Sequence, residues 1–399
     1  MLKSQILKIN SKHFLAIIEH LYANGGQARL VGGVVRDALL GLPAADVDIA
    51  TDLLPEEVVA ILAKAGIKTI PTGIKFGTVT ALIKGESFEI TTLRRDLSCD
   101  GRHADVSYSK NFAEDAARRD FTINAISYCP ITHQIYDYFN GIEDLESQRV
   151  VFIGDAKERI TEDYLRILRF FRFSCRYAKQ IDEDGLSACR QLRDNLPNLS
   201  GERLKSEIDL LLPLNGSPKI LQTMFDSGIL QKILPINEYD SQTHNQLLKC
   251  AESFEELASL TALYAMLFMN SKNISVKSLL QLKFSRTEAK QICAMLNLQD
   301  EKNISSIIRN LKNIWLDDSA YVQYFIFIAS ITKDNSSIIE LYNKLSKLPI
   351  HKLPIDGNDL IKLGFSGIEL GKQINYLRAS WVESDFALSK SDLINMVKK

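Results

Sequence analysis

The chain has 399 residues, of which 46% are apolar and 24% are charged, proportions typical of a globular protein with two to four domains. The formal net charge of −1 excludes bulk basicity as a means of binding nucleic acid, so any RNA-binding surface has to be a local basic patch. The six cysteines are scattered and form no C-x-x-C pair, which argues against a zinc site and for a reducing cytoplasm.

Neither a secretory leader nor a membrane segment is expected from the sequence. The N-terminal residues lack the apolar core of a signal peptide. The most apolar stretch, Tyr321 to Ile331, is too short to cross a bilayer and is expected to be a buried helix. We therefore predict a cytoplasmic protein that has no contact with a membrane.

The first predicted elements are a helix, a strand and a glycine pair. Apolar residues at helical spacing mark the helix: Phe14, Ile17, Ile18 and Leu21. A strand at Ala28–Val31 then leads into Gly32 and Gly33. Because glycine has no Cβ, the pair can turn sharply and direct backbone N–H groups at an anion. A tight turn without a ligand is the plainer interpretation.

Two aspartates, Asp46 and Asp48, follow the glycine pair. On a strand, residues i and i+2 point to the same side about 7 Å apart, so both carboxylates can share metal ions. Hard oxygen ligands suit Mg²⁺, which also binds triphosphate oxygens. A solvated strand edge would explain the aspartates alone, but the glycines and aspartates together favour a site for a nucleoside triphosphate and its metals.

A helix at Pro55–Ala65 and three extended runs are predicted next, the runs being 67–70, 76–83 and 87–93. Glu89 stands between apolar residues of the last run. It would complete a carboxylate trio if that run lay beside Asp46 and Asp48, and a surface-facing position is equally consistent with the pattern. The polar segment Asp96–Asn111 contains Gly101, lacks periodicity and is predicted to be a mobile loop.

A helix from Glu114 to Tyr128 is predicted to carry a second cluster, RRDFTINA at 118–125. On it, Asp120 and Asn124 would lie one turn apart with Arg119 nearby. Aspartate accepts hydrogen bonds from ribose hydroxyls, asparagine donates or accepts, and arginine binds phosphate. A solvated, charged helix end is the alternative, and the cluster by itself favours that alternative.

The third cluster is EDYLR at 162–166, which places Asp163 and Arg166 three residues apart. Cytosine and adenine both offer an amino donor beside a ring-nitrogen acceptor, which an aspartate and an arginine can pair with. Uracil and guanine offer a keto oxygen and a ring N–H there, so both side chains would be left mismatched. An ordinary surface ion pair is the alternative, and spacing alone favours it.

Basic residues continue beyond this cluster. Arg169, Arg172 and Arg176 alternate with phenylalanines and form either a stripe that meets phosphate or a solvated face over an apolar core. A smaller basic patch includes Arg94. After about residue 150 apolar residues recur at helical spacing to the end, with a break at 197–201 followed by a helix at Glu202–Leu212.

The ordered clusters resemble the class II tRNA nucleotidyltransferase and bacterial poly(A) polymerase family. The matching motifs are GGVVRD at 32–37 with Asp46-x-Asp48, RRDFTINA at 118–125 and ED-x-x-R at 162–166. The segments 137–145 and 199–203 look like the family's head-to-neck segment and neck continuation, and residues 356–371 like its C-terminal helical end.

The resemblance implies an α+β head with a polymerase-β-like nucleotidyltransferase fold (residues 1–150), followed by an all-α neck (151–215), body (216–345) and tail (346–399). It implies addition of CCA to the tRNA 3′ end from CTP and ATP, with Mg²⁺ as cofactor. Asp46 and Asp48 would carry the metals, and Gly32, Gly33 and Arg36 would bind the triphosphate. By the same resemblance Arg119, Asp120 and Asn124 hold ribose and phosphates, Asp163 and Arg166 recognise the base, and the loop after Leu93 helps the switch from CTP to ATP.

Other functions remain open at this stage. A poly(A) polymerase of the family would share every motif, and a CC-adding or A-adding specialist is a further alternative. CC-adding members tend to have a shortened loop, and the loop here does not look shortened. A non-catalytic RNA-binding protein is opposed by the intact Asp46 and Asp48. The phosphohydrolase domain fused to some members is not expected, because His103 is followed by Ala104 and no His-Asp dipeptide occurs.

Overall fold

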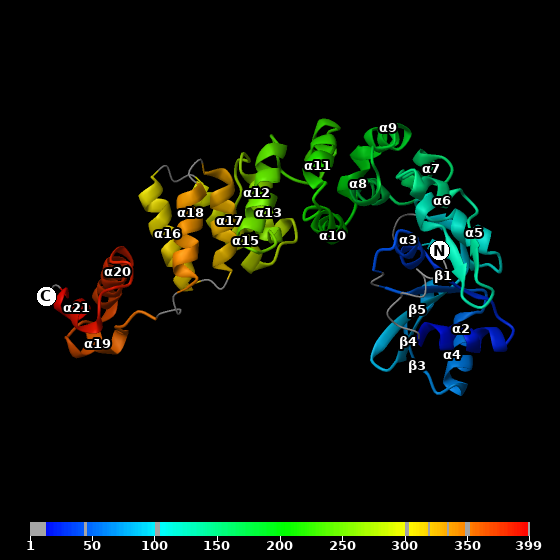
Figure 1. Cartoon of the computed structure of the whole chain (residues 1–399), viewed down its shortest axis with the longest axis horizontal. Coiled ribbons are helices and arrows are strands. Elements are labelled where there is room, and N and C mark those ends of the chain that lie inside the picture. Colours follow the sequence, from blue (N-terminus) through cyan, green and yellow to red (C-terminus); the bar gives the residue numbers. More distant parts are fainter. Residues whose placement is uncertain are drawn as a thin grey trace. The chain divides into compact units, whose positions relative to one another are not determined.

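The computed structural model describes residues 13–43, 46–99, 104–299, 303–317, 320–332, 335–347 and 352–397 (Figure 1). The chain forms two compact units. The first comprises Met1–Ile208 with Ser227–Ile233, and the second comprises Asp209–Asp226 with Leu234–Lys399. Gly101 and His103, named above, lie outside the described residues.

A seven-stranded sheet in the order β3-β4-β5-β2-β1-β8-β9 forms the base of the first unit. Its strands are β1 (Ala28–Val31), β2 (Asp48–Thr51), β3 (Lys68–Gly73), β4 (Thr78–Ile83), β5 (Glu86–Thr92), β8 (Ser127–Cys129) and β9 (Gln134–Tyr136). The pair β2–β5 is parallel, and the other five pairs are antiparallel. The strands and the helix predicted between 55 and 93 are confirmed to within two residues, except that the first strand ends three residues later than predicted.

One face of the sheet packs on helices α2 (His13–Ala23) and α4 (Pro55–Lys64). Leu30, Ile49 and Ile90 belong to this core cluster. Since side chains alternate along a strand, Asp48 and Glu89 lie on the opposite face, away from these helices. The sheet thus separates the apolar core from the carboxylates.

The segment predicted to be an aperiodic loop contains a two-stranded hairpin, so that prediction is wrong for most of its length. Strand β6 (Arg94–Cys99) pairs antiparallel with β7 (Ala104–Tyr108). Ladder hydrogen bonds join backbones whatever the side chains, so a polar hairpin shows no apolar alternation. Mobility of this segment stays a prediction.

The helix predicted from Glu114 to Tyr128 is also wrong. Helix α5 (Phe112–Ala117) ends before the cluster, and a 3-10 turn (η2, Thr122–Asn124) leads into β8. Backbone pairing with a distant segment explains the difference: the Thr122 N–H donates to the Val151 carbonyl at 3.1 Å, and the Ile153 N–H donates to the Asp120 carbonyl at 3.1 Å. Tertiary pairing here overrides the local helical pattern.

Helix α3 (Gly33–Leu39) lies between β1 and β2 in the chain and contacts β1. After β9 the chain forms α6 (Gly141–Glu146), α7 (Ala156–Glu162), α8 (Arg166–Tyr177), α9 (Glu183–Leu192) and α10 (Gly201–Leu211), whose last three residues belong to the second unit. Helix α8 buries a row of aromatic rings: Phe170 stacks on Phe152 at 5.3 Å between centroids, and Phe173 lies 5.4 Å from Phe121. These rings fix α8 against the irregular segment that follows α5.

The second unit is helical throughout its described residues. Its helices are α11 (Ser217–Asp226), α12 (Ser241–Ser253), α13 (Leu260–Phe268), α14 (Val276–Gln281), α15 (Arg286–Gln299), α16 (Ile304–Asp317), α17 (Tyr321–Ile331), α18 (Asn335–Leu345), α19 (Gly357–Lys362), α20 (Gly367–Glu383) and α21 (Lys390–Asn395). The buried helix predicted at Tyr321–Ile331 is confirmed as α17. Among the described helices, none combines the length and the apolar character needed to span a membrane.

The predicted fold class, an α+β head followed by helices, is therefore confirmed. The strands between β1 and β9 all precede residue 137, and the described residues beyond that point form helices and connections. The division of the helical part into neck, body and tail stays a prediction.

Candidate active site

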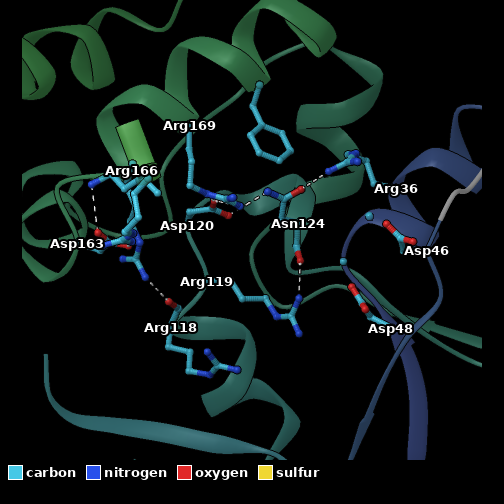
Figure 2. Close-up of a pocket in the computed structure, with 15 residues that line it drawn as sticks. Arg36, Asp46, Asp48, Arg118, Arg119, Asp120, Asn124, Asp163, Arg166 and Arg169 are labelled. Atoms are coloured by element: carbon cyan, nitrogen blue, oxygen red, sulfur yellow. Dashed lines mark hydrogen bonds and ion pairs between the residues drawn. The ribbon is translucent and has the colours of Figure 1, made fainter. Parts of the chain in front are cut away.

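A cavity of about 630 Å³ opens in the first unit, between the ends of the central strands β1 and β2 and helix α8 (Figure 2). It brings together eleven of the residues singled out from the sequence: Gly32, Gly33, Arg36, Asp46, Asp48, Arg119, Asp120, Asn124, Asp163, Arg166 and Arg169. Arg118, Leu165, Phe173 and Arg203 complete its lining. Segments more than a hundred residues apart in the sequence thus meet at one opening.

The glycine pair lies at one end of this cavity. Gly32 has φ 70° and ψ −129°, a conformation in which a side chain is strained, and a Cβ there would lie 3.1 Å from the Arg119 guanidinium. Arg36, on α3, donates to the Asn124 Oδ1 at 2.5 Å and to the Asp37 Oδ1 at 2.8 Å. The close backbone and two guanidinium groups form a surface suited to an anion.

Asp46 and Asp48 lie beside the glycine pair, Asp48 at the start of β2 (Figure 2). Glu89 is the register partner of Asp48 on the parallel strand β5. Burial raises the pKa of Asp48, the Glu89 carboxylate raises it further and Asp46 adds to this, while Arg119 opposes them. Crowded carboxylates of this kind are relieved by a cation.

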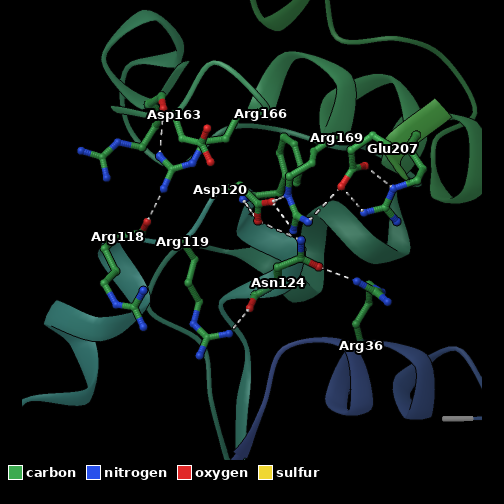
Figure 3. Close-up of polar contacts among 12 residues, drawn as sticks. Arg36, Arg118, Arg119, Asp120, Asn124, Asp163, Arg166, Arg169 and Glu207 are labelled. Carbon is green, nitrogen blue, oxygen red and sulfur yellow. Dashed lines mark hydrogen bonds and ion pairs between the residues drawn. The ribbon is translucent and has the colours of Figure 1, made fainter. Parts of the chain in front are cut away.

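The pair Asp120 and Asn124 meets in the cavity although no helix joins them (Figure 3). The Asn124 Nδ2 donates to the Asp120 Oδ1 at 2.9 Å, and the Arg169 Nε donates to the Asp120 Oδ2 at 2.7 Å. Burial acts to raise the pKa of Asp120, but Arg169 and the hydrogen bonds outweigh it and hold the pKa below its usual value. Asp120 is therefore an ionised, oriented acceptor.

Two guanidinium groups on the cavity wall are positioned by a carboxylate that the sequence analysis missed. Asp115 is buried; it accepts from Arg118 Nε at 2.9 Å and from Arg119 at 3.2 Å. Burial acts to raise the pKa of Asp115, and the two arginines reverse the effect and lower it. Its spacing of three and four residues from the arginines was the available signal.

At the far end of the cavity, Asp163 and Arg166 lie at the junction of α7 and α8 (Figure 3). Arg166 donates to the Glu162 Oε2 at 2.6 Å, to the Arg118 carbonyl at 2.8 Å and to the Arg159 carbonyl at 2.9 Å. Asp163 accepts from Arg203, and its backbone is extended with φ −154°. Each of the two side chains is thus held by partners of its own.

The three arginines of the α8 stripe each lie beside a carboxylate. Arg169 pairs with Asp120, and Arg172 donates through Nε to the Glu207 Oε2 at 2.6 Å. Arg176 keeps 46% of its side chain exposed beside Asp37. Contact of these arginines with RNA stays a prediction, as it does for Arg94, which donates to the Phe76 carbonyl at 3.0 Å.

Comparison with known proteins identifies the family. Residues 28–151 match the poly A polymerase head domain, and residues 180–240 match the probable RNA- and SrmB-binding site of polymerase A. The mitochondrial CCA tRNA nucleotidyltransferase 1 of Danio rerio is 34% identical over 96% of this chain and 90% of its own length. The chain belongs to the CCA tRNA nucleotidyltransferase family.

Two further members of the family support this assignment. The CCA-adding enzyme of Oceanobacillus iheyensis is 33% identical over 86% of each chain. The crystal structure of the Bacillus stearothermophilus CCA-adding enzyme in complex with CTP superposes with a TM-score of 0.77 at 28% identity, covering 93% of this chain and 92% of that one. The resemblance stated from the motifs is thus confirmed along nearly the whole chain.

Three cavity partners escaped the sequence analysis as functional residues: Asp115, Arg203 and Glu207. Arg203 and Glu207 lie on α10 and meet residues 35 to 40 positions earlier in the chain. A local sequence pattern does not predict which distant residues these two side chains contact. The available signal was the four-residue spacing of Arg203 and Glu207, which places a base and an acid on one helix face at the end of the segment that resembles the family's neck.

Proposed function

We propose that this protein adds CCA to the 3′ end of tRNA, taking the nucleotides from CTP and ATP and releasing pyrophosphate. The observation that carries the proposal is the union, in one cavity, of the carboxylate pair Asp46 and Asp48 with the guanidinium groups and the Asp163–Arg166 pair. The CCA-adding relatives along the whole chain support it.

Each part of the cavity has a task in this reaction. Arg36 and Arg119, with the close backbone at Gly32 and Gly33, bind the triphosphate and neutralise its charge. Asp120 accepts a hydrogen bond from the ribose, with Asn124 and Arg169 fixing its orientation. Asp163 accepts from the base amino group, and Arg166 donates to the ring nitrogen.

In the transfer step the primer 3′-hydroxyl oxygen forms a bond to the α-phosphorus, and the bond from that phosphorus to the bridging oxygen breaks. Pyrophosphate leaves in line with the attacking oxygen. The protein's contribution is to position both reactants and to surround the developing charge with guanidinium groups.

Mg²⁺ is the proposed cofactor, and the residues present fit it. Asp46 and Asp48 offer hard oxygen ligands, and the raised pKa of Asp48, due first to burial and then to Glu89, reflects a local excess of negative charge. Within the described residues no group of three acidic, histidine or cysteine side chains is placed to hold an ion alone, so triphosphate oxygens would complete the coordination. Bound Mg²⁺ would lower the pKa of the hydroxyl and stabilise the leaving oxygens.

Two related questions go with the proposal. A poly(A) polymerase or a CC-adding or A-adding specialist would use the same cavity, and the relatives named as CCA-adding favour full CCA addition. A cytoplasmic location stays a prediction, since the Danio rerio relative is named as mitochondrial.

Primer extension tests the function directly. The substrate is a tRNA transcript that lacks its last three nucleotides, with Mg²⁺ and each nucleoside triphosphate alone or mixed. We expect product that stops after three additions and requires CTP and then ATP. A long tail from ATP alone, with CTP ignored, would identify a poly(A) polymerase instead.

A further inference from the structure

Helix α10 directs two charged residues, Arg203 and Glu207, at the charged groups of the cavity. They stand four residues apart, so they share one face of the helix. Arg203 donates to the Asp163 Oδ2 at 2.7 Å, across 40 residues of sequence. We propose that Arg203 is a positioning residue for base recognition, which orients the Asp163 carboxylate and thereby sets the discrimination of CTP and ATP from UTP and GTP. This inference rests on the function proposed above.

Both oxygens of the Asp163 carboxylate have a hydrogen-bond donor. The Leu165 N–H donates to Oδ1 at 3.1 Å, and Arg203 donates to Oδ2 at 2.7 Å. The terminal torsion of an aspartate is broad and only roughly two-fold, so one donor leaves the carboxylate plane free to rotate. Two donors on different oxygens fix that plane. Each carboxylate oxygen has two lone pairs, so an acceptor remains for the amino group of a base.

The backbone at Asp163 is extended, between two helices. Asp163 follows the last residue of α7 and precedes α8, with φ −154° and ψ 105°. Residues inside a helix have their side chains directed by regular neighbours, and Asp163 has no such support. The Arg203 contact comes from another element and supplies the missing constraint. Because Arg203 keeps about a third of its side chain exposed and Asp163 somewhat less, the pair stays accessible to a nucleotide.

Rejection of UTP and GTP depends on the direction in which the Asp163 carboxylate points. An ionised carboxylate only accepts hydrogen bonds, so it pairs with the amino groups of cytosine and adenine and opposes the keto oxygens of uracil and guanine. The penalty exists only while the carboxylate faces the base edge. A carboxylate that turns away, or that admits a bridging water, loses this penalty.

The contacts of Arg166 limit the effect to one half of the recognition. Arg166 is held by Glu162 and by two backbone carbonyls, and these contacts do not involve Arg203. Loss of Arg203 is therefore expected to weaken the acceptor half and to leave the donor half in place. Discrimination should fall, while nucleotide transfer continues.

The test compares kcat and KM for CTP and UTP on a tRNA lacking its last three nucleotides. The variants are R203M, which removes the guanidinium but keeps the chain length, R203K, which keeps the charge, and D163A with and without R203M. The matched control is R149M. Arg149 makes an ion pair of the same length, 2.7 Å, with Asp144 and does not line the cavity.

We expect R203M to lower the CTP-to-UTP ratio of kcat/KM about tenfold or more, and R203K to recover part of the loss. R149M should keep the wild-type ratio. In the D163A background, adding R203M should change the ratio no further, because the two residues act as one unit.

An unchanged ratio in folded R203M, or an equal further loss in the D163A background, would overturn the inference. Thermal melting shows whether each variant folds. If R203M does not fold, the CTP-to-UTP ratio of kcat/KM is measured on R203K instead, and an unchanged ratio there would equally overturn the inference. A wild-type protein that ignores CTP would contradict the proposed function instead, so the two failures are told apart.

Discussion

Asp48 and Glu89 lie opposite each other on the parallel strands β2 and β5, on the sheet face turned away from helices α2 and α4. Neighbouring parallel strands place register partners about 5 Å apart, so the two negative charges lie close together. Asp48 lines the cavity, and Glu89 is not among its lining residues. Burial raises the pKa of Asp48, and the nearby Glu89 carboxylate raises it further. This excess of negative charge fits the Mg²⁺ site proposed above.

Replacement of either aspartate proposed to bind the metal should abolish transfer. Asp46→Ala and Asp48→Ala are each expected to lower the rate for every nucleotide by roughly a thousandfold, since several kcal/mol of charge stabilisation is lost. Primer extension measures the rate, and circular dichroism shows that the fold is kept. Asp194→Asn, which alters an exposed pair with Lys232, is the control and should keep full activity. Near-normal turnover of either alanine variant would remove the metal assignment.

The same aspartate should limit stability near neutral pH. A carboxyl whose pKa is raised by folding binds its proton more tightly in the native state, so its contribution to the free energy of unfolding falls as pH rises through the unfolded value toward the folded one. Asp48→Asn removes that loss. We expect the metal-free variant to melt at a higher temperature than the wild type at pH 7, and to lose this advantage at pH 3. A lower melting temperature at pH 7 would refute the electrostatic argument.

Asp163→Ala should lose selectivity more than it loses stability. The side chain is partly exposed and is proposed to contact the base, so its removal takes away the acceptor that rejects UTP and GTP. The ratio of kcat/KM for CTP and UTP is expected to fall by roughly ten to a hundredfold. Single-nucleotide incorporation measures the ratio, and thermal melting measures stability. If nucleotide selectivity is unchanged, Asp163 does not recognise the base.

Glu207→Gln should slow all nucleotides alike. Glu207 is buried and accepts a hydrogen bond from Arg172. One of its oxygens also lies 3.6 Å from a nitrogen of Arg169. Arg169 in turn donates to Asp120, the residue proposed to accept a hydrogen bond from the ribose. Neutralising it leaves two guanidinium groups undercompensated, so we expect a loss of roughly 3 kcal/mol of stability. In the variant that remains folded at 20 °C, kcat/KM for CTP, ATP and UTP should fall by one common factor.

The contrast with Arg203 makes this prediction specific. Both residues lie on α10, but one acts through Asp120 and the other through Asp163. Glu202→Gln, at an exposed position of the same helix, is the control and should leave both rate and selectivity unchanged. A change in the CTP-to-UTP ratio of Glu207→Gln would mean that the two contacts are not independent.

His244 in the second unit should make stability depend on pH. It is fully buried, and its Nδ1 lies 2.8 Å from the Tyr239 hydroxyl; burial lowers its pKa from 6.5 to about 4. A base with a lowered pKa binds fewer protons when folded, so stability is complete above pH 6.5 and falls as pH drops toward 4. The full loss is about 3 kcal/mol.

Denaturation of the wild type and His244→Gln between pH 7 and pH 4 measures this effect. The variant is expected to be less stable at pH 7 but to show a shallower decline with acidity. His133→Gln, at an exposed position in the first unit, should keep the wild-type dependence of stability on pH. Parallel slopes for the wild type and His244→Gln would show that this histidine does not contribute.

The sequence by itself determined the parts of the site that are local. Asp46 and Asp48 line one cavity as the two-residue spacing predicted, although β2 begins only at Asp48 and Asp46 precedes the strand. Gly32 adopts a positive φ because only glycine does so without strain. The change to helical apolar spacing near residue 150 predicted the helical part of the chain, and the family resemblance implied the α+β head. These features depend on neighbours within a few residues, which a sequence displays.

Tertiary structure decided which distant residues come into contact. Asp120 and Asn124 were expected on one helix, but backbone pairing with residues 151–153 replaced that helix and still brought them together. The parallel pairing of β2 with β5 made Glu89 the register partner of Asp48, but Glu89 is exposed and is not among the residues that line the cavity. Within the described residues no three carboxylates are placed to hold an ion, so the carboxylate trio considered from the sequence does not form, and a catalytic part for Glu89 stays a prediction. Arg203 and Glu207 reach Asp163 and Arg172 only through the packing of α10 on α8. Such contacts depend on loop closure and on the burial of charge, which no local pattern of residues encodes.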